Sequence, residues 1–249
     1  MKIFVLLSRV PFPLEKGDKL RAYYQLKYLS QKHEIHLCAL NDKKIHPDAI
    51  SALQPFCKSI KILSLSSVCR VYNMLITFFN GKPIQVGYFY SKKNQLSVSR
   101  LISEIKPDRV FCQLLRVAVY VKNCKIIKIL DYQDAFSAGM GKRIPGASWL
   151  FKPFFRTEYK RLVKYENEIF PIFDKRIIIS FQDRDMIRHP ENNKIFVIPN
   201  GVDTEYFRLQ AMPKEYDLLF SVNMSYDPNI IRAEYLAKRI LPRVIQKYP

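Results

Sequence analysis

The sequence predicts an α/β fold built on a doubly wound, Rossmann-like parallel sheet. Short apolar runs rich in Ile, Val and Leu alternate with segments whose apolar residues recur at helical spacing. Strands of that composition are buried on both faces of a parallel sheet, and helices cover each face. No internal repeat or low-complexity linker interrupts the pattern.

The first third of the chain supplies the opening elements. The run 3–8, "IFVLLS", predicts a buried strand, and 18–32 predicts an amphipathic helix because its Leu and Tyr residues fall near helical spacing. A second strand is expected at 34–40, a helix at 47–57 and a third strand at 59–65.

The same alternation continues toward the carboxyl end. In chain order we expect a helix at 91–106, strands at 108–114 and 124–132, a long basic and aromatic helix at about 147–170, a strand at 174–180, a short helix at 181–188 and a strand at 194–199. Since such sheets bind ligands at the carboxyl ends of their strands, the loops there are the candidates for chemistry.

The pattern changes after residue 207. We expect a first domain over 1–207, a linker over 208–215, one more strand at 216–222 and one more helix at 230–248. A single strand and helix cannot close a hydrophobic core, so 216–249 is expected to open an incomplete second domain. The alternative is a tail that packs on the first domain.

The composition indicates a folded, basic protein. It has 249 residues, 48% hydrophobic, and 41 Lys and Arg against 22 Asp and Glu, a formal charge of +19. This charge suggests nucleic acid, an anionic membrane face or phosphorylated small molecules as partners. Five cysteines without a C-x-x-C motif favour a reducing cytoplasm, and neither they nor the four histidines have metal-site spacing.

The amino-terminal run is too short for a signal peptide, and no stretch reaches the roughly 18 apolar residues of a membrane span.

The loop after the first strand, "SRVPFPLEKGDKLR", has a glycine just before a helix. Gly17 permits close ligand approach, Asp18 is the expected N-cap, and helix-end N–H groups suit a phosphate or a sugar hydroxyl. The alternative is an ordinary capped loop, because neither G-x-G-x-x-G nor a P-loop is present. The substrate-binding candidates here are Lys16, Gly17, Asp18, Lys19 and Arg21.

A second loop, "ILDYQDAFSAGMGKR", follows the strand that Asp131 closes. Asp134 and Ser137 are expected to face the crevice, where Asp134 accepts hydrogen bonds from sugar hydroxyls. The alternative makes Asp134 a helix cap.

The helix at about 147–170 has basic residues every four positions and aromatic residues at its start. Such a helix can rest on an anionic membrane, and the aromatic stretch 73–90 can extend that patch; alternatively it is a solvated face with a buried aromatic anchor. The membrane-surface candidates are Trp149, Phe154, Phe155, Arg156, Lys160 and Lys164.

The stretch "KIFVIPNGVDTEYF" ends a strand abruptly. Asn200 and Gly201 predict a turn because both tolerate positive φ, and they are expected at the crevice rim. Val202 and Phe207 are expected to be apolar plugs, and Asp203 to cap the short turn that follows.

Taken together, these stretches resemble glycosyltransferase family four, retaining enzymes of the GT-B architecture. "VIPNGVDTEYF" resembles their hinge-proximal motif. "PFPLEKGDKLRAYYQLKYLSQKHEIHLCAL", "LDYQDAFS", "YKRLVKYENEIFPIFDKRIIISFQDRDMI" and "SVNMSYDPNIIRAEYLAKRILPRVIQKYP" resemble, in order, the branch met in bacterial exopolysaccharide loci. The resemblance covers nearly all of the chain.

The resemblance implies transfer of a hexose from a nucleotide sugar, with retention and without metal or other cofactor. The amino-terminal domain would hold a lipid-linked or polysaccharide acceptor at the cytoplasmic face of the plasma membrane. The donor-binding residues and paired glutamates of such enzymes are absent, so this chain is expected to be inactive alone. No residue is assigned as catalytic, and a histidine frequent in relatives is missing from "LDYQDAFS".

Two other functions stay open. A basic nucleic-acid-binding protein fits the charge, although no helix-turn-helix, RNA-recognition or zinc pattern appears and the basic residues are spread along the chain. The second alternative is a non-catalytic module that binds a membrane surface.

Overall fold

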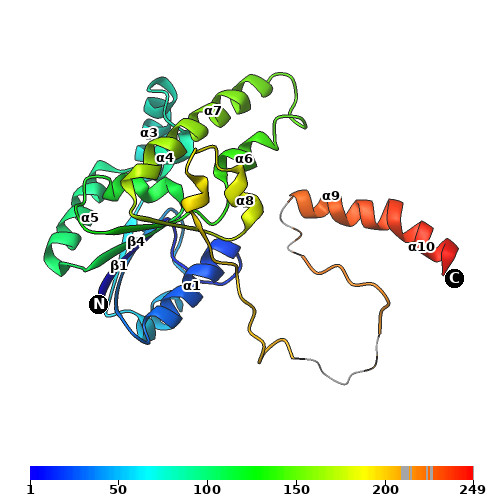
Figure 1. The fold of residues 1–249 in the computed structure, drawn as a ribbon, viewed down its shortest axis with the longest axis horizontal. Helices are drawn as coiled ribbons and strands as arrows, with labels where there is room; N and C mark the ends of the chain where they lie inside the picture. Colours follow the sequence, from blue (N-terminus) through cyan, green and yellow to red (C-terminus); the bar gives the residue numbers. More distant parts are fainter. Residues whose placement is uncertain (209–212, 214, 223, 225–226, 249) are drawn as a thin grey trace. The chain divides into compact units, whose positions relative to one another are not determined.

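The computed structural model describes residues 1–208, 213, 215–222, 224 and 227–248. The chain divides into two units, Met1–Gly201 and Val202–Pro249. In the first unit a central sheet lies between layers of helices (Figure 1).

The described part of the first unit forms a seven-stranded sheet in the order β3-β2-β1-β4-β5-β6-β7, with every neighbouring pair parallel. The chain winds outward from β1 to β3, returns to the centre and winds outward on the other side from β4 to β7. The two windings meet between β1 and β4, where such sheets form their ligand crevice. The strands are β1 Lys2–Leu7, β2 Glu34–Asn41, β3 Ser59–Ser64, β4 Arg109–Gln113, β5 Lys128–Asp131, β6 Lys175–Ile178 and β7 Phe196–Val197.

Helices join these strands. The α-helices are α1 Gly17–Leu29, α2 Ala49–Leu53, α3 Ser67–Phe79, α4 Ile84–Phe89, α5 Lys92–Ile105, α6 Phe136–Gly141, α7 Lys152–Ile169 and α8 Phe181–Met186. Shorter 3₁₀ segments are η1 Gln54–Phe56, η2 Leu115–Val121, η3 Phe170–Ile172 and η4 Asn192–Lys194.

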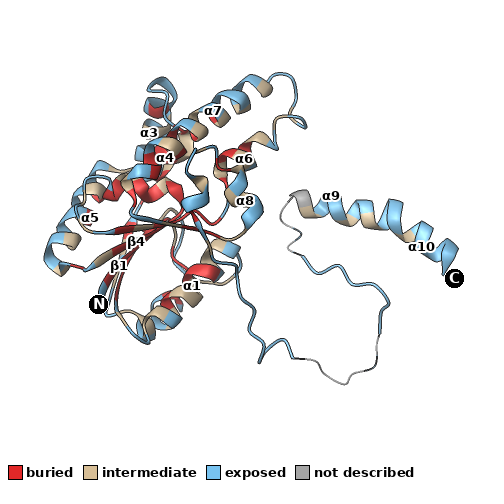
Figure 2. Cartoon of the chain, viewed as in Figure 1, coloured by how far each residue is buried: buried red, intermediate tan, exposed pale blue. Residues whose placement is uncertain are grey.

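Two hydrophobic cores lie on opposite faces of the sheet, because successive strand side chains point to opposite sides. Phe4 and Leu6 of β1 join the core beneath α5 and α7, while Ile3, Val5 and Leu7 join the core beneath α1 and α2. The buried colour in Figure 2 accordingly follows the strands and the inner sides of the helices. The α/β doubly wound fold expected from the sequence is confirmed.

The main differences lie at element ends and in two helices that were not predicted. The expected strand 124–132 is paired over Lys128–Asp131, and the helix expected from 147 begins at Lys152. Helices α3 and α4 occupy a region for which no element was expected. The apolar residues of α3 face outward, whereas the apolar stripe of a surface helix ordinarily faces the core.

The second unit contains α9 Asp227–Tyr235, a π-helical turn η5 Leu236–Ile240 and α10 Leu241–Lys247, with Pro242 in the first turn of α10. The expected helix is thus present. The expected strand 216–222 is not, since these described residues pair with no other strand, and an isolated strand leaves its backbone groups unbonded.

The expected linker 208–215 lies largely outside the described residues. Asp203 caps its turn as expected, because its Oδ1 accepts the N–H groups of Glu205 and Tyr206 at 3.2 and 3.1 Å. Val202 and Phe207 are exposed and are therefore not plugs.

Candidate functional site

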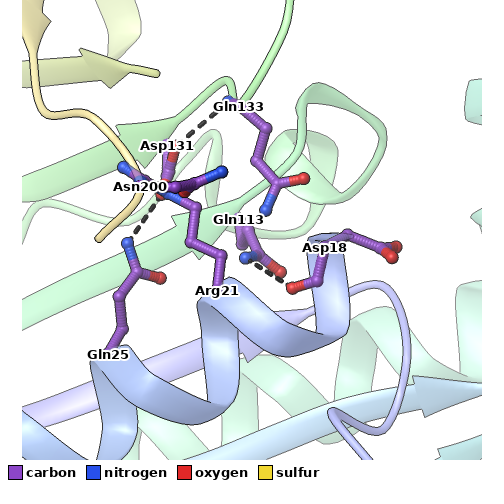
Figure 3. Close-up of polar contacts among 7 residues, drawn as sticks. All are labelled: Asp18, Arg21, Gln25, Gln113, Asp131, Gln133 and Asn200. Carbon is purple, nitrogen blue, oxygen red and sulfur yellow. Dashed lines mark hydrogen bonds and ion pairs between the residues drawn. The ribbon is translucent and has the colours of Figure 1, made fainter. Parts of the chain in front are cut away.

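A buried ion pair stands at the carboxyl edge of the sheet. Arg21 Nε, from α1, lies 2.7 Å from Oδ2 of Asp131, the last residue of β5, and the side chains are 5% and 0% exposed (Figure 3). Arg21 Nη1 also donates to Oδ1 of Asn200 at 2.8 Å. Three distant parts of the chain therefore meet in one network.

The Asp131 carboxylate also accepts hydrogen bonds from two other groups of the protein. Gln25 Nε2 donates to Oδ2 at 2.8 Å, and the Gln133 N–H donates to Oδ1 at 3.0 Å. A buried carboxylate needs such partners to offset its desolvation. Arg21 and Asn200, expected to touch substrate, thus have partners inside the protein, although Arg21 Nη2 is buried without one among the described residues.

The loop after β1 is fastened by a second pair. Arg9 Nη1 lies 3.0 Å from Asp18 Oδ2, and Gln113 Nε2 at the end of β4 donates to the Asp18 carbonyl at 3.1 Å. The expectation that Asp18 caps the helix is wrong. Lys16 is the N-cap, and Asp18 sits in the first turn, where its carboxylate pairs with Arg9 and complements the positive helix end.

Gly17 opens α1 with unfilled space around it. A Cβ at this position would meet no atom of the described protein within 4 Å. Lys16 is exposed, whereas Lys19 is engaged with Glu15 at 3.0 Å, and this contact lowers the pKa of the Glu15 carboxyl. The loop at Gly17 thus has room for a ligand, and the exposed side chain of Lys16 lies next to it in the chain.

Asp134 and Ser137 differ in exposure, because Asp134 is exposed and Ser137 is buried. Asp134 is exposed at the rim, where partial removal of solvent raises the pKa of its carboxyl, and repulsion from Asp183 adds to this. The cap alternative is not what forms, because the N-cap of α6 is Ala135.

Ser137 is buried. Its hydroxyl donates to Glu166 Oε2 at 2.6 Å and its N–H donates to Oε1 at 3.0 Å. Both donors of Ser137 are therefore bonded to a residue of α7.

Arg116 is a rim residue that the sequence analysis missed. It follows β4 in η2, with its guanidinium carbon 4.7 Å and 5.0 Å from the ring centroids of Phe89 and Phe136. Burial, together with the nearby positive charge of Arg9, lowers the pKa of this arginine to about 10. Its Nε is buried and has no hydrogen-bond partner in the described part of the protein.

Gln133 adds another unsatisfied donor at this edge. Its backbone has φ of 63°, a strained value for a residue with a side chain, and its buried Nε2 lacks a partner among residues with described positions. Strained loop residues cluster at functional sites. The signal for Arg116 and Gln133 was their position just beyond predicted strands 108–114 and 124–132.

Asn200 and Gly201 do reach the rim, but through backbone that is not left-handed, so the expected positive-φ turn is not formed. Gly201 is exposed.

The membrane-surface candidates lie away from this network, in and before α7. Trp149 is 78% exposed and Phe154 is exposed, so the aromatic residues are not a buried anchor there. Phe155 is half-buried. The basic candidates Arg156, Lys160 and Lys164 are exposed.

Within the described ranges, no helix is long and apolar enough to cross a membrane. Over the same residues, no cluster of three His, Cys, Asp or Glu side chains is arranged to hold a metal ion.

No protein-family model matches the chain, and no curated protein matches it. Among solved structures, a sucrose-phosphate synthase from Thermosynechococcus elongatus is 14% identical, with a TM-score of 0.51 over 85% of this chain and 51% of its own. Phytolacca americana UGT2, complexed with UDP-2fluoro-glucose and pterostilbene, is 9% identical, with a TM-score of 0.47 over 81% and 54%. UDP-GlcNAc 2-epimerase from Neisseria meningitidis, bound to UDP-GlcNAc, is 11% identical, with a TM-score of 0.45 over 79% and 45%.

The chain spans about half the length of these solved structures. At such identities the likeness concerns the fold alone. The described sheet and the synthase match together give the first unit the Rossmann-like α/β fold found in GT-B enzymes.

Proposed function

We propose that this chain is the acceptor-binding part of a retaining hexosyltransferase of the GT-B architecture, resembling family four and its exopolysaccharide branch. The acceptor would be a lipid-linked or polysaccharide glycan at the cytoplasmic face of the plasma membrane. The donor would be a nucleotide sugar held by a lobe beyond the described residues, without metal or other cofactor. Residues 1–249 alone would then support no turnover.

The observation that carries this proposal is the set of unsatisfied donors at the carboxyl edge of the sheet. Arg21 Nη2, Arg116 Nε and Gln133 Nε2 are buried and lack partners among the described residues. Buried donors left unpaired are costly, and an oxygen-rich ligand would satisfy them. Arginine in particular suits phosphate oxygens, as in a diphosphate-linked acceptor.

The acidic rim groups complement these donors. Asp134 is exposed and accepts hydrogen bonds, as sugar hydroxyls require. The open space at Gly17 leaves room for a ligand to approach the backbone of α1. Diphosphate and sugar together therefore fit the rim better than either does alone.

Calorimetric titration with inorganic pyrophosphate tests the anion site. Arg116→Gln is expected to weaken binding about tenfold, the cost of one charge-assisted contact. Arg109→Gln is the matched control, because Arg109 begins β4, at the end of the strand opposite to the η2 segment that holds Arg116. Equal affinity of the two variants would count against the site.

A transfer assay with UDP-glucose and a diphosphate-linked glycolipid tests the half-domain role. No product is expected from residues 1–249, and turnover by this chain alone would contradict that role. A salt-dependent gel shift with oligonucleotides that Arg116→Gln leaves unchanged would instead favour the nucleic-acid alternative.

A further inference from the structure

Helix α3 presents a row of apolar side chains to solvent. Val68, Val71, Tyr72, Leu75 and Phe79 recur at helical spacing, and the two ends of the row, Val68 and Phe79, are 79% and 81% exposed. A surface helix ordinarily turns its apolar stripe toward the core. A contiguous apolar face that points outward marks an interaction site.

The inner side of α3 is what attaches it to the protein. Arg70 lies 3.5 Å from Asp42 and donates to the Tyr88 hydroxyl. Gly87 of α4 allows close approach, because a Cβ there would come within 2.8 Å of the Asn73 carbonyl oxygen. Since the polar and small residues hold the helix in place, the apolar row is left free to contact something else.

A basic groove of about 1100 Å³ borders the same helix. Ile76 and Thr77 of α3 and Asn80, the C-cap residue of this helix, form part of its wall. Its charged lining residues are all lysines, with no Asp or Glu among the described residues that line it; they are Lys82, Lys106, Lys122 and Lys125. These four side chains are exposed and form no ion pair within the described structure.

We propose that the outward row of α3 and the adjoining lysine groove form a docking surface for an anionic lipid bilayer. The apolar row would enter the interface between headgroups and acyl chains, and the lysines would face lipid phosphates. This goes beyond the proposed function, because it assigns bilayer contact to α3 rather than to the α7 residues suggested by the sequence.

Charge argues for a bilayer over the other occupants. A second copy across a two-fold axis would bring the lysine groove toward its own equivalent, and like charges facing each other are unfavourable. Nucleic acid would satisfy the lysines but leave the apolar row in water. An anionic bilayer satisfies both features at once.

Vesicle co-sedimentation tests the surface in the full chain. Val71→Ser, Leu75→Ser and Phe79→Ser together are expected to reduce partition onto phosphatidylcholine–phosphatidylglycerol vesicles about tenfold or more. Replacing Lys82, Lys106, Lys122 and Lys125 by Gln is expected to reduce the preference for anionic over pure phosphatidylcholine vesicles. The matched control replaces Trp149 and Phe154 by Ser and Lys160 and Lys164 by Gln, and it is expected to bind as wild type.

A native cysteine supplies a second readout that needs no substitution. Cys69 lies in α3 and is exposed. An environment-sensitive fluorophore on its thiol is expected to shift to the blue on anionic vesicles. The chain's single tryptophan, Trp149 before α7, is expected to keep its emission.

Three results in the vesicle experiment would overturn the proposal. They are absence of wild-type binding to anionic vesicles, equal binding by the α3 triple variant, and a larger loss in the α7 control than in α3. A dimer in sedimentation equilibrium that the α3 changes dissolve would also overturn it, in favour of a second copy. Pyrophosphate binding is measured separately, so failure here leaves the proposed function standing.

Discussion

Arg21 and Asp131 are 110 positions apart in the chain and 2.7 Å apart in space, and together they tie α1 to the end of β5. The pair is buried, so the cost of removing both charges from water is offset by their mutual contact and by Gln25 and Asn200. This contact therefore joins α1 to the carboxyl edge of the sheet.

Breaking the pair on one side is expected to destabilise the first unit strongly. Asp131→Asn leaves a buried arginine without its counter-charge, which costs about 3–5 kcal/mol of unfolding free energy. Urea denaturation measures the change. Arg100→Gln removes an exposed pair with Glu104 and is expected to change little.

Arg21→Lys is expected not to rescue the network, because a lysine ammonium cannot hold Asp131 and Asn200 in the geometry of the guanidinium fork. Wild-type stability in that variant would show that charge alone suffices.

Two glycines are expected to respond oppositely to alanine. Gly87→Ala places a methyl group against Thr77 and the Asn73 carbonyl, which forces α3 and α4 apart and costs about 1–3 kcal/mol. Gly17→Ala meets only open space at the start of a helix and is expected to keep or slightly raise stability. Thermal unfolding of the two variants compares them, and equal losses would contradict the packing argument.

Glu166 is expected to make stability fall as pH rises. Burial raises the pKa of its carboxyl above the usual 4.5, which outweighs the two hydrogen bonds from Ser137 that favour the ionised form. The folded protein thus holds this proton more tightly than the unfolded chain does. The contribution is full below pH 4.5 and is lost as pH passes the raised value.

Urea unfolding of wild type and Glu166→Gln across this range tests the sign. The unfolding free energy of the variant, relative to that of the wild type, is expected to rise with increasing pH. A difference that does not change with pH would mean that Glu166 titrates alike in both states.

The cysteines are expected to differ sharply in reactivity. Cys69 is exposed, whereas Cys38 is buried, and burial raises the pKa of the Cys38 thiol to about 12. Because the thiolate is the reactive form, a thiol reagent at mildly alkaline pH should modify Cys69 first. Loss of the fast phase in Cys69→Ser is the expected check, and a fast phase that persists would place the reactive thiol elsewhere.

The fold was accessible from the sequence because its signal is local. Runs such as 3–8 and 34–40 are apolar throughout, as strands buried on both faces must be, and they were found as β1 and β2. The strand expected at 216–222 failed for the opposite reason, since a strand requires a partner that a local pattern does not reveal.

The site was accessible only in part. Position after a strand was enough to suggest Gly17, Asp134 and Asn200 as rim residues. It did not reveal that Arg21 would form an ion pair with Asp131, or that Arg116 would contact the rings of Phe89 and Phe136, because these contacts join residues far apart in the chain. Helix α3 was not predicted, although its apolar residues recur at helical spacing; the sequence alone does not show that these residues face water.

The bond from Arg21 to Asn200 fixes the place where the polypeptide departs from the sheet. The chain that continues beyond Gly201 is therefore attached at Asn200 to Arg21, the same side chain that pairs with Asp131 at the end of β5. A ligand that drew Arg21 toward itself would be expected to lengthen this hydrogen bond and so to loosen the chain at Asn200.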